Sequence, residues 1–313
     1  MRRFLLGLIV LVGWVVSVAA GPEGSFRMED PPGDDFGPGT YLYPKNKVFA
    51  PYHGHFDLRS FSVAIVGEEV HYEVTMGLMA NPWQAPEGFS HQVIEVYIHR
   101  GRQGRNEPPV PGTSVRFAPD YPWDVRLKAA PWEAGELLFL RPDGRMERRF
   151  LRVGLAGPRT IRMTVPLSLL GWPSSKWRYY VLVGSYDGFA EDNFRPVMAK
   201  PGEWHFGGGR DDGWDPNVID LLAPPRGRFS QERQLGSFDA ARGEYAVLFP
   251  VGPGGLPGAR LPGGPMILLV LLLIGGWMLW YAPASWRKRA QAFWQKVRSR
   301  FRTFLSRRYK DGS

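Results

Sequence analysis

The chain has 313 residues, a formal net charge of +9 and no cysteine, so disulfide bonds are excluded and an exported domain would depend on its core or on a metal. The positive charge lies at the two ends, because residues 284–313 contribute +9 and Arg2 and Arg3 contribute +2. Residues 21–283 are left with −2, which gives no support to nucleic-acid binding.

The first 20 residues have the parts of a secretion signal. Two arginines precede an almost wholly apolar stretch at residues 4–18, and the small residues at 17–20 resemble a cleavage site. The alternative is an uncleaved N-terminal anchor. In both cases the chain that follows is expected to be exported.

The first motif of the exported domain is acidic. Asp30, Asp34 and Asp35 fall within six positions, and glycines and prolines between them force the backbone to turn. Clustered carboxylates on a tight loop are the ligands that a hard cation such as calcium requires. The motif predicts a structural Ca²⁺ site at these three residues, against the alternative of ordinary Asp-containing turns.

The rest of the exported region has the pattern of a β domain. Apolar and polar residues alternate within short segments that are separated by turn sequences. The expected strands lie within 56–79 (two runs), 92–99, 136–140, 146–153, 160–165, 177–185 and 244–251. No stretch has the pattern of a long amphipathic helix. Residues 21–251 are therefore predicted to form one all-β domain, a single antiparallel β-sandwich.

The C-terminal segments indicate membrane attachment. Residues 252–265 are rich in glycine and proline and are predicted to be a linker. The apolar run at 266–282, with aromatic residues at its far end, predicts a transmembrane helix rather than a buried core helix. The basic tail, residues 283–313, has aromatic residues at helical spacing, which predicts an amphipathic helix on lipid of the inner leaflet. A plain stop-transfer anchor and docking on a cytoplasmic partner are the alternatives.

Seven tryptophans lie in the expected domain. A tryptophan in a sandwich is more often part of the core, but an exposed indole face can stack on a sugar ring. Trp83 and Trp214 lie in polar loops, whereas Trp177 and Trp204 are predicted to be core residues. The predicted ligand-binding residues are Trp83, Gln84, Trp214, Asp215 and Asn217.

No catalytic motif is present, since the sequence contains no nucleophile elbow, His-Glu-x-x-His or phosphate-binding loop. His53 and His55 offer two imidazoles without a third ligand, a weak metal signal. The acidic clusters at 187–192 and 211–215 are predicted to be turns, and Gly207 to Gly209 indicate flexible backbone or a close approach. A carboxylate pair for glycoside hydrolysis needs no sequence motif, and nothing positive supports one.

Ten short phrases, taken in order, resemble the C-terminal binding module of glucodextranase. They are DPPGDDFGPGTY (30–41), FDL (56–58), NPW (81–83), GFS (88–90), EVY (95–97), GF (188–189), DNFR (192–195), EW (203–204), FGGG (206–209) and PNVIDLL (216–222). The resemblance implies a non-catalytic sandwich related to sugar- and haem-binding (DOMON-like) domains. Similar modules often carry structural calcium, which adds weight to Asp30, Asp34 and Asp35. Because no catalytic domain precedes the module here, we do not expect it to attach an enzyme in cis.

Together these observations predict a bacterial single-pass protein of the cytoplasmic membrane, with its folded domain outside and its C-terminus in the cytoplasm. The expected function is non-catalytic binding of a glycan, either an α-glucan or a cell-envelope polymer. The alternative is an envelope scaffold that binds a protein partner, such as a transporter or a secreted amylolytic enzyme, without sugar contact. An unrecognised hydrolase is a third hypothesis.

Overall fold

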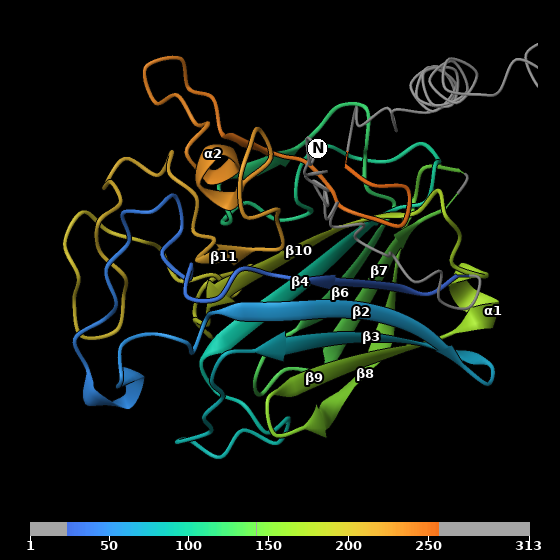
Figure 1. Ribbon diagram of the computed structural model, residues 1–313, viewed down its shortest axis with the longest axis horizontal. Coiled ribbons are helices and arrows are strands. Elements are labelled where there is room, and N and C mark those ends of the chain that lie inside the picture. Colours follow the sequence, from blue (N-terminus) through green and yellow to red (C-terminus); the bar gives the residue numbers. More distant parts are fainter. Residues whose placement is uncertain (1–23, 142, 257–313) are drawn as a thin grey trace, which may run out of the picture. The chain divides into compact units, whose positions relative to one another are not determined.

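The computed structural model describes residues 24–141 and 143–256 (Figure 1). The predicted signal, the predicted transmembrane helix at 266–282 and the basic tail at 283–313 lie outside these residues. Within the part of the chain that is described, no helix has the length and apolar character needed to cross a membrane. The membrane segments therefore stay predictions.

Strands make up most of the regular structure, and the helices are short. The strands are β1 (Phe26–Glu29), β2 (Leu58–Val66), β3 (Glu69–Met76), β4 (Gln92–His99), β5 (Val115–Phe117), β6 (Val125–Ala129), β7 (Gly135–Leu140), β8 (Met146–Gly157), β9 (Thr160–Pro166), β10 (Arg178–Ser185), β11 (Asp220–Leu221) and β12 (Ala246–Leu248). The helices are the 3-10 helix η1 (Lys47–Phe49), α1 (Leu167–Leu170) and α2 (Gln231–Leu235).

Ten of the strands form one antiparallel sheet in the order β1-β2-β3-β9-β8-β7-β6-β4-β10-β11. The sheet curls along β8, since the first half of this strand pairs with β7 and the second half with β9. The two halves then face each other, and their strands cross at an angle in Figure 1. Contacts between the halves confirm this arrangement, because the rings of Phe26 and Phe61 each lie 5.4 Å from the ring of Tyr179 in β10. The prediction of an antiparallel β fold is confirmed: ten strands form one curled sheet, and β5 and β12 form a separate parallel pair.

Burial in the core explains why apolar and polar residues alternate along the strands. In β3, Val70, Tyr72, Val74 and Met76 point into the core between the halves, while the residues between them are half-exposed. Each fully buried side chain of this size contributes about 1.5–3 kcal/mol to the free energy of unfolding. Strands β4 and β10 are buried on both faces, because a second cluster from β5, β12 and α2 covers their outer side. This covering layer buries β10 although it lies next to the edge strand β11 in the sheet order.

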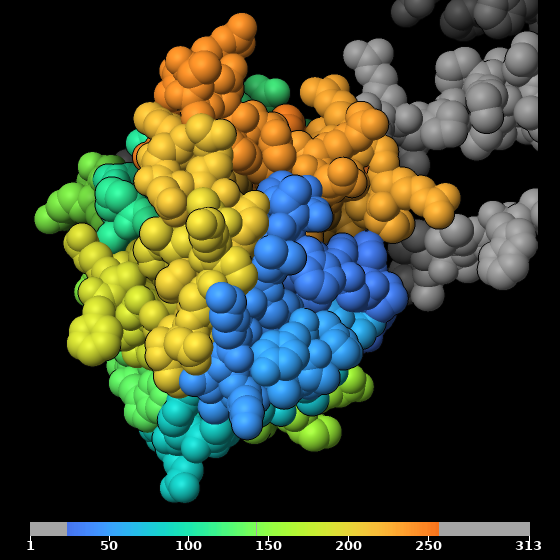
Figure 2. All heavy atoms as spheres, turned by 90° about the vertical axis from the view of Figure 1, so that its left-hand side faces the viewer, coloured from blue at the N-terminus to red at the C-terminus, as the bar shows by residue number. Residues whose placement is uncertain are grey.

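Two loop regions far apart in the sequence meet at one side of the module. Figure 2 shows the residues near 30–55 (blue) beside those near 190–225 (yellow) on this face. The backbones of Leu42 and Gly207 exchange hydrogen bonds of 2.8 and 2.9 Å, and the Tyr41 hydroxyl donates to Pro216 O at 2.5 Å. Gly208 has a φ of +81°, and a Cβ added there would lie 2.0 Å from Thr40 O. The glycine run is therefore a site of close backbone approach.

Replacing Gly208 with alanine is expected to lower the free energy of unfolding by about 2 kcal/mol, measured by urea denaturation. The new Cβ would meet the Thr40 carbonyl in a left-handed conformation that L residues avoid. Gly213→Ala is the matched control, because Gly213 has a similar φ of +75° and open space around an added Cβ. Equal losses in the two variants would contradict the close approach at Gly208.

Candidate functional site

An aromatic pocket of about 290 Å³ lies where β4 begins and β10 ends. Three tryptophans line it, Trp83, Trp132 and Trp204, together with Phe189, His91 and Arg195. These side chains come from loops that are widely separated in the sequence. A pocket with apolar walls and a few polar groups is the usual form of a small-ligand site.

The three tryptophans form a row of half-exposed indoles. Trp83 is 41 % exposed, Trp132 45 % and Trp204 43 %. The Trp83 ring lies 6.0 Å from that of Trp204 and 6.4 Å from that of Trp132. The prediction that Trp204 belongs to the core is wrong, whereas Trp177, which is 5 % exposed, is a core residue as predicted.

The loop that carries Trp83 is braced by the side chain of Asn81. Its Oδ1 accepts a 2.8 Å hydrogen bond from Ala85 N and another from the Ser90 hydroxyl, and its Nδ2 donates to Ala85 O at 2.8 Å. Asparagine closes such turns because its side chain can replace backbone partners. The bracing helps to hold the Trp83 indole at the pocket, where its ring also lies 5.1 Å from that of His91.

Trp132 has an unusual backbone conformation. Its φ of +56° lies in the left-handed region, which bulky residues rarely adopt. The backbone N–H of Trp132 donates to Glu87 Oε2 at 2.9 Å. This hydrogen bond joins the loop between β6 and β7 to the loop of Trp83. Residues held in such conformations cluster at binding sites. The strain at Trp132 therefore supports a functional role for the pocket.

The polar groups of the pocket carry little net charge. Arg195 Nη1 pairs with Asp187 Oδ2 at 3.2 Å, and its Nη2 donates to Tyr186 O at 3.0 Å. His91 is 2 % exposed, and no described residue makes a hydrogen bond to either of its ring nitrogens. Burial, with the nearby His55 ring, lowers the pKa of His91 to about 4. His91 is therefore neutral at pH 7 and can both donate and accept a hydrogen bond.

None of the other predicted ligand-binding residues lines this pocket. Gln84 follows Trp83 in the exposed part of the same loop, and Trp214 packs on Tyr245 with ring centroids 4.9 Å apart. Asp215 is buried and accepts a 3.1 Å hydrogen bond from Arg210 N. Asn217 accepts from Val197 N at 2.8 Å and donates to Gly112 O at 2.5 Å. Asp215 and Asn217 thus stabilise loops.

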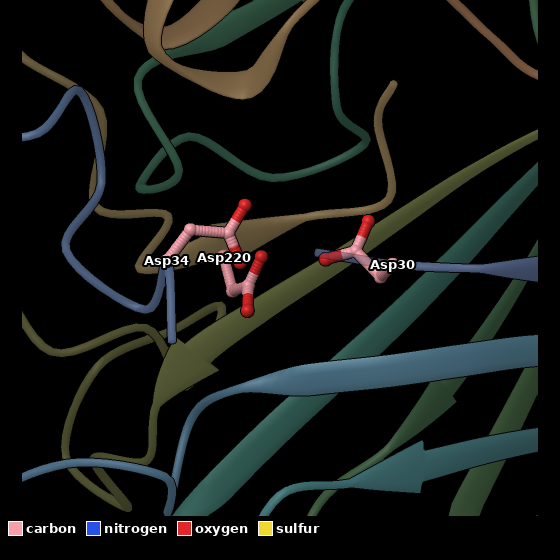
Figure 3. A group of neighbouring side chains, drawn as sticks. All are labelled: Asp30, Asp34 and Asp220. Carbon is pink, nitrogen blue, oxygen red and sulfur yellow. The ribbon is translucent and has the colours of Figure 1, made fainter. Parts of the chain in front are cut away.

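A group of three carboxylates lies at the edge of the sheet, formed by Asp30, Asp34 and Asp220 (Figure 3). One oxygen from each residue lies within 4.8 Å of the others. Asp30 directly follows β1, Asp34 lies in the next turn, and Asp220 begins β11. Asp35 is not in the group, because it is buried elsewhere and accepts hydrogen bonds from Gly54 N, at 2.8 Å, and from the Tyr43 hydroxyl.

Hydrogen bonds within the fold hold two of these carboxylates in place. Asp30 Oδ1 accepts from Ala223 N at 2.9 Å, and Asp220 Oδ2 accepts from Leu58 N at 2.7 Å. Burial and repulsion from the neighbouring carboxylates raise the pKa of Asp30 to about 9 and that of Asp34 to about 7, and raise the pKa of Asp220 well above its usual value. Such a group requires either protons or a cation, and its oxygens fit a hard cation.

The histidine pair does not extend to a metal group. His53 Nδ1 lies 3.0 Å from Pro51 O, and His55 Nε2 lies 3.1 Å from Ala50 O. Among the described residues, no group of three potential metal ligands contains a histidine. The clusters at 187–192 and 211–215 form turns and bends, as predicted.

The chain matches a known protein-family model. A family model described as the C-terminal binding module, SLH-like, of glucodextranase matches residues 26–250. This match includes nearly all of the described residues, and therefore both the aromatic pocket and the carboxylate group. No curated protein matches the chain. Since the match covers well over half of the sequence, the chain belongs to the family of SLH-like C-terminal binding modules of glucodextranase.

Proposed function

We propose that the module binds a glycan in the aromatic pocket and catalyses no reaction. The observation that carries the proposal is the row of three half-exposed tryptophans, Trp204, Trp83 and Trp132, in one braced pocket. The face of an indole packs well against the C–H groups of a sugar ring, while polar groups at the edge bind hydroxyls. Membership in a family of binding modules, described by its occurrence in glucodextranase, supports the same conclusion.

The charges of the pocket favour a neutral sugar. Asp187 and Arg195 neutralise each other, and His91 is uncharged because burial holds its pKa at about 4. An anionic ligand would need an unpaired cation to offset its loss of water, and these groups supply none. A carboxylate accepts a hydrogen bond and a guanidinium donates one, so the pair can bind sugar hydroxyls, which both donate and accept. An α-glucan or a neutral envelope polymer fits these requirements.

The proposed site of action is the outer side of the cytoplasmic membrane. The support is in the sequence: a secretion signal at 1–20, an apolar run at 266–282 and a basic tail at 283–313. The linker at 252–265 would then place the module close to the membrane. Anchoring there would hold a bound glycan near the cell surface.

The proposal is tested by retention of the full chain, purified in mild detergent, on immobilised α-glucans and on purified cell wall. We expect retention on at least one of them and release by soluble oligosaccharide from the same polymer. Quenching or enhancement of tryptophan fluorescence should accompany binding, since three indoles line the pocket. If neither material retains the protein and a transporter or secreted enzyme co-purifies with it, the scaffold hypothesis replaces glycan binding.

A further inference from the structure

We propose that Asp30, Asp34 and Asp220 are ligands of a structural calcium ion. This site differs from the one that the sequence motif predicts, because Asp220 takes the place of Asp35. It lies apart from the aromatic pocket and does not depend on glycan binding. The two sites have no lining residue in common.

Unpaired oxygens are the first observation that supports a cation. Asp30 is 6 % exposed, and its buried Oδ2 has no hydrogen-bond partner among the residues that the structure describes. Figure 3 shows the carboxylates of Asp30, Asp34 and Asp220 turned toward a common space. Asp34 Oδ1 is also buried and unpartnered. A buried carboxylate oxygen without a partner is costly, and a bound cation removes that cost.

The balance of charge is the second observation. A fourth carboxylate, Asp57, lies next to the group and accepts a 3.2 Å hydrogen bond from Gly33 N, the residue before Asp34. Arg59 Nη2 pairs with Asp57 Oδ2 at 2.8 Å, so this guanidinium neutralises Asp57. Within residues 24–141 and 143–256, no ion pair offsets the charge of the three remaining carboxylates. A divalent ion supplies two of the missing charges.

Distances and access suit calcium. Ca²⁺–oxygen bonds are about 2.3–2.6 Å long, so two ligands of one ion lie up to roughly 5 Å apart, and the separations here are within 4.8 Å. Mg²⁺ forms shorter bonds of about 2.0–2.1 Å and demands a near-ideal octahedron, so it tolerates a narrower range of ligand positions than Ca²⁺ does. A cavity of about 300 Å³ lined by Gly33, Asp34 and Gln231 adjoins the group. It gives an ion an access route and leaves room for water ligands.

The ion would join segments that are distant in sequence. Asp30 and Asp34 belong to the N-terminal loop, whereas Asp220 begins β11 at the opposite end of the sheet order. The Asp220 carboxylate also accepts from Leu58 N at the start of β2. Calcium at this point would therefore link the first and last strands of the curled sheet.

The test uses the full chain, freed of metal with EDTA and then titrated with Ca²⁺, with thermal unfolding and metal content as readouts. We expect one calcium ion per chain. For a site with a Kd of 0.1–1 mM, 10 mM Ca²⁺ should raise Tm by roughly 3–10 °C. Asp34→Asn should raise the Ca²⁺ concentration needed for half of this shift by about tenfold or more, because it removes one charged ligand. Asp34 Oδ1 has no hydrogen-bond partner in the described part of the chain, so this change is not expected to break a contact of that atom.

Asp35→Asn is the matched control, since it changes the adjacent aspartate outside the group. We expect it to lower Tm with and without calcium while the Ca²⁺-dependent shift remains. Asp220→Asn is a second ligand variant, and metal content decides the result if it unfolds too early for a Tm. An unchanged Tm in EDTA, a shift with Mg²⁺ but not Ca²⁺, or an unaltered Ca²⁺ response in Asp34→Asn would each overturn the proposal.

Discussion

Replacing both Trp83 and Trp204 with alanine is expected to abolish retention on the glycan that holds the wild-type protein. Each indole presents a half-exposed face to the pocket, and the two rings lie 6.0 Å apart. Truncation of a tryptophan at the centre of a binding site costs about 2 kcal/mol or more, which corresponds to roughly a 30-fold loss of affinity for each variant. The affinities of the single and double variants would be measured by titration with soluble oligosaccharide.

Trp172→Ala provides the control for this experiment. Trp172 is 68 % exposed and does not line the pocket, so its removal tests for a general effect of losing a surface indole. We expect its affinity to match that of the wild type. Unfolding curves for all variants would show whether the pocket variants are folded. Full retention of the folded double variant would mean that the sugar binds elsewhere, and the pocket would lose its assigned role.

The strands that could be predicted are those in which apolar and polar residues alternate, because this pattern indicates a sheet with one buried face. The predicted ranges contain β2, β3, β4, β10 and β12, and they overlap β7, β8 and β9, of which β8 runs four residues beyond its predicted end at 153. β6 was missed although its apolar residues alternate with Arg126 and Lys128. Both charged side chains are buried, because Arg126 pairs with Glu95 at 2.8 Å and Lys128 donates to Asn193. The alternation at 125–129 is itself a local strand signal, and only the burial of the two charged side chains depends on distant residues.

The candidate sites could be predicted only in part, because neighbours in sequence need not share a site. Trp83 was expected to be exposed from its polar loop, and the structure places it in the pocket. Trp132 and Trp204 become pocket residues through the way that separate loops pack, which a single sequence does not encode locally. Asp35 follows Asp34 in sequence but points to Gly54 and Tyr43 instead. Asp220 lay within the family-like phrase at 216–222, without any signal that identified it as a ligand.

The metal-free protein is expected to lose stability as the pH rises from 6.5 to 9. Asp30 has a folded-state pKa raised to about 9, whereas its usual value is 3.8, so in this range the folded protein keeps a proton that the unfolded chain has released. A raised carboxyl pKa stabilises the fold at low pH and ceases to do so as pH passes the folded-state value. The loss is about 1.4 kcal/mol per pH unit for each such proton, and Asp220, whose pKa burial also raises, acts in the same direction as Asp30.

The pH range begins at 6.5 to exclude the titration of His91, which changes the stability of the fold in the opposite direction. Burial lowers the pKa of His91 to about 4 from 6.5, so its contribution is complete above pH 6.5 and is lost as pH falls toward 4. Urea denaturation in EDTA at several pH values, combined with circular dichroism, measures the dependence. Asp212→Asn, which changes an exposed carboxylate outside the group, should keep the same slope as the wild type.

Asp30→Asn gives the most decisive comparison, because it keeps the shape of the side chain and removes the titrating proton. In EDTA at pH 9 this variant should be more stable than the wild type, and its slope between pH 6.5 and 9 should be smaller. Bound calcium should flatten the wild-type slope as well, since the ion holds the carboxylates in their charged form. A wild-type protein whose stability in EDTA is constant or rises over this range would show that Asp30 is already ionised, and would contradict the electrostatic account of the carboxylate group.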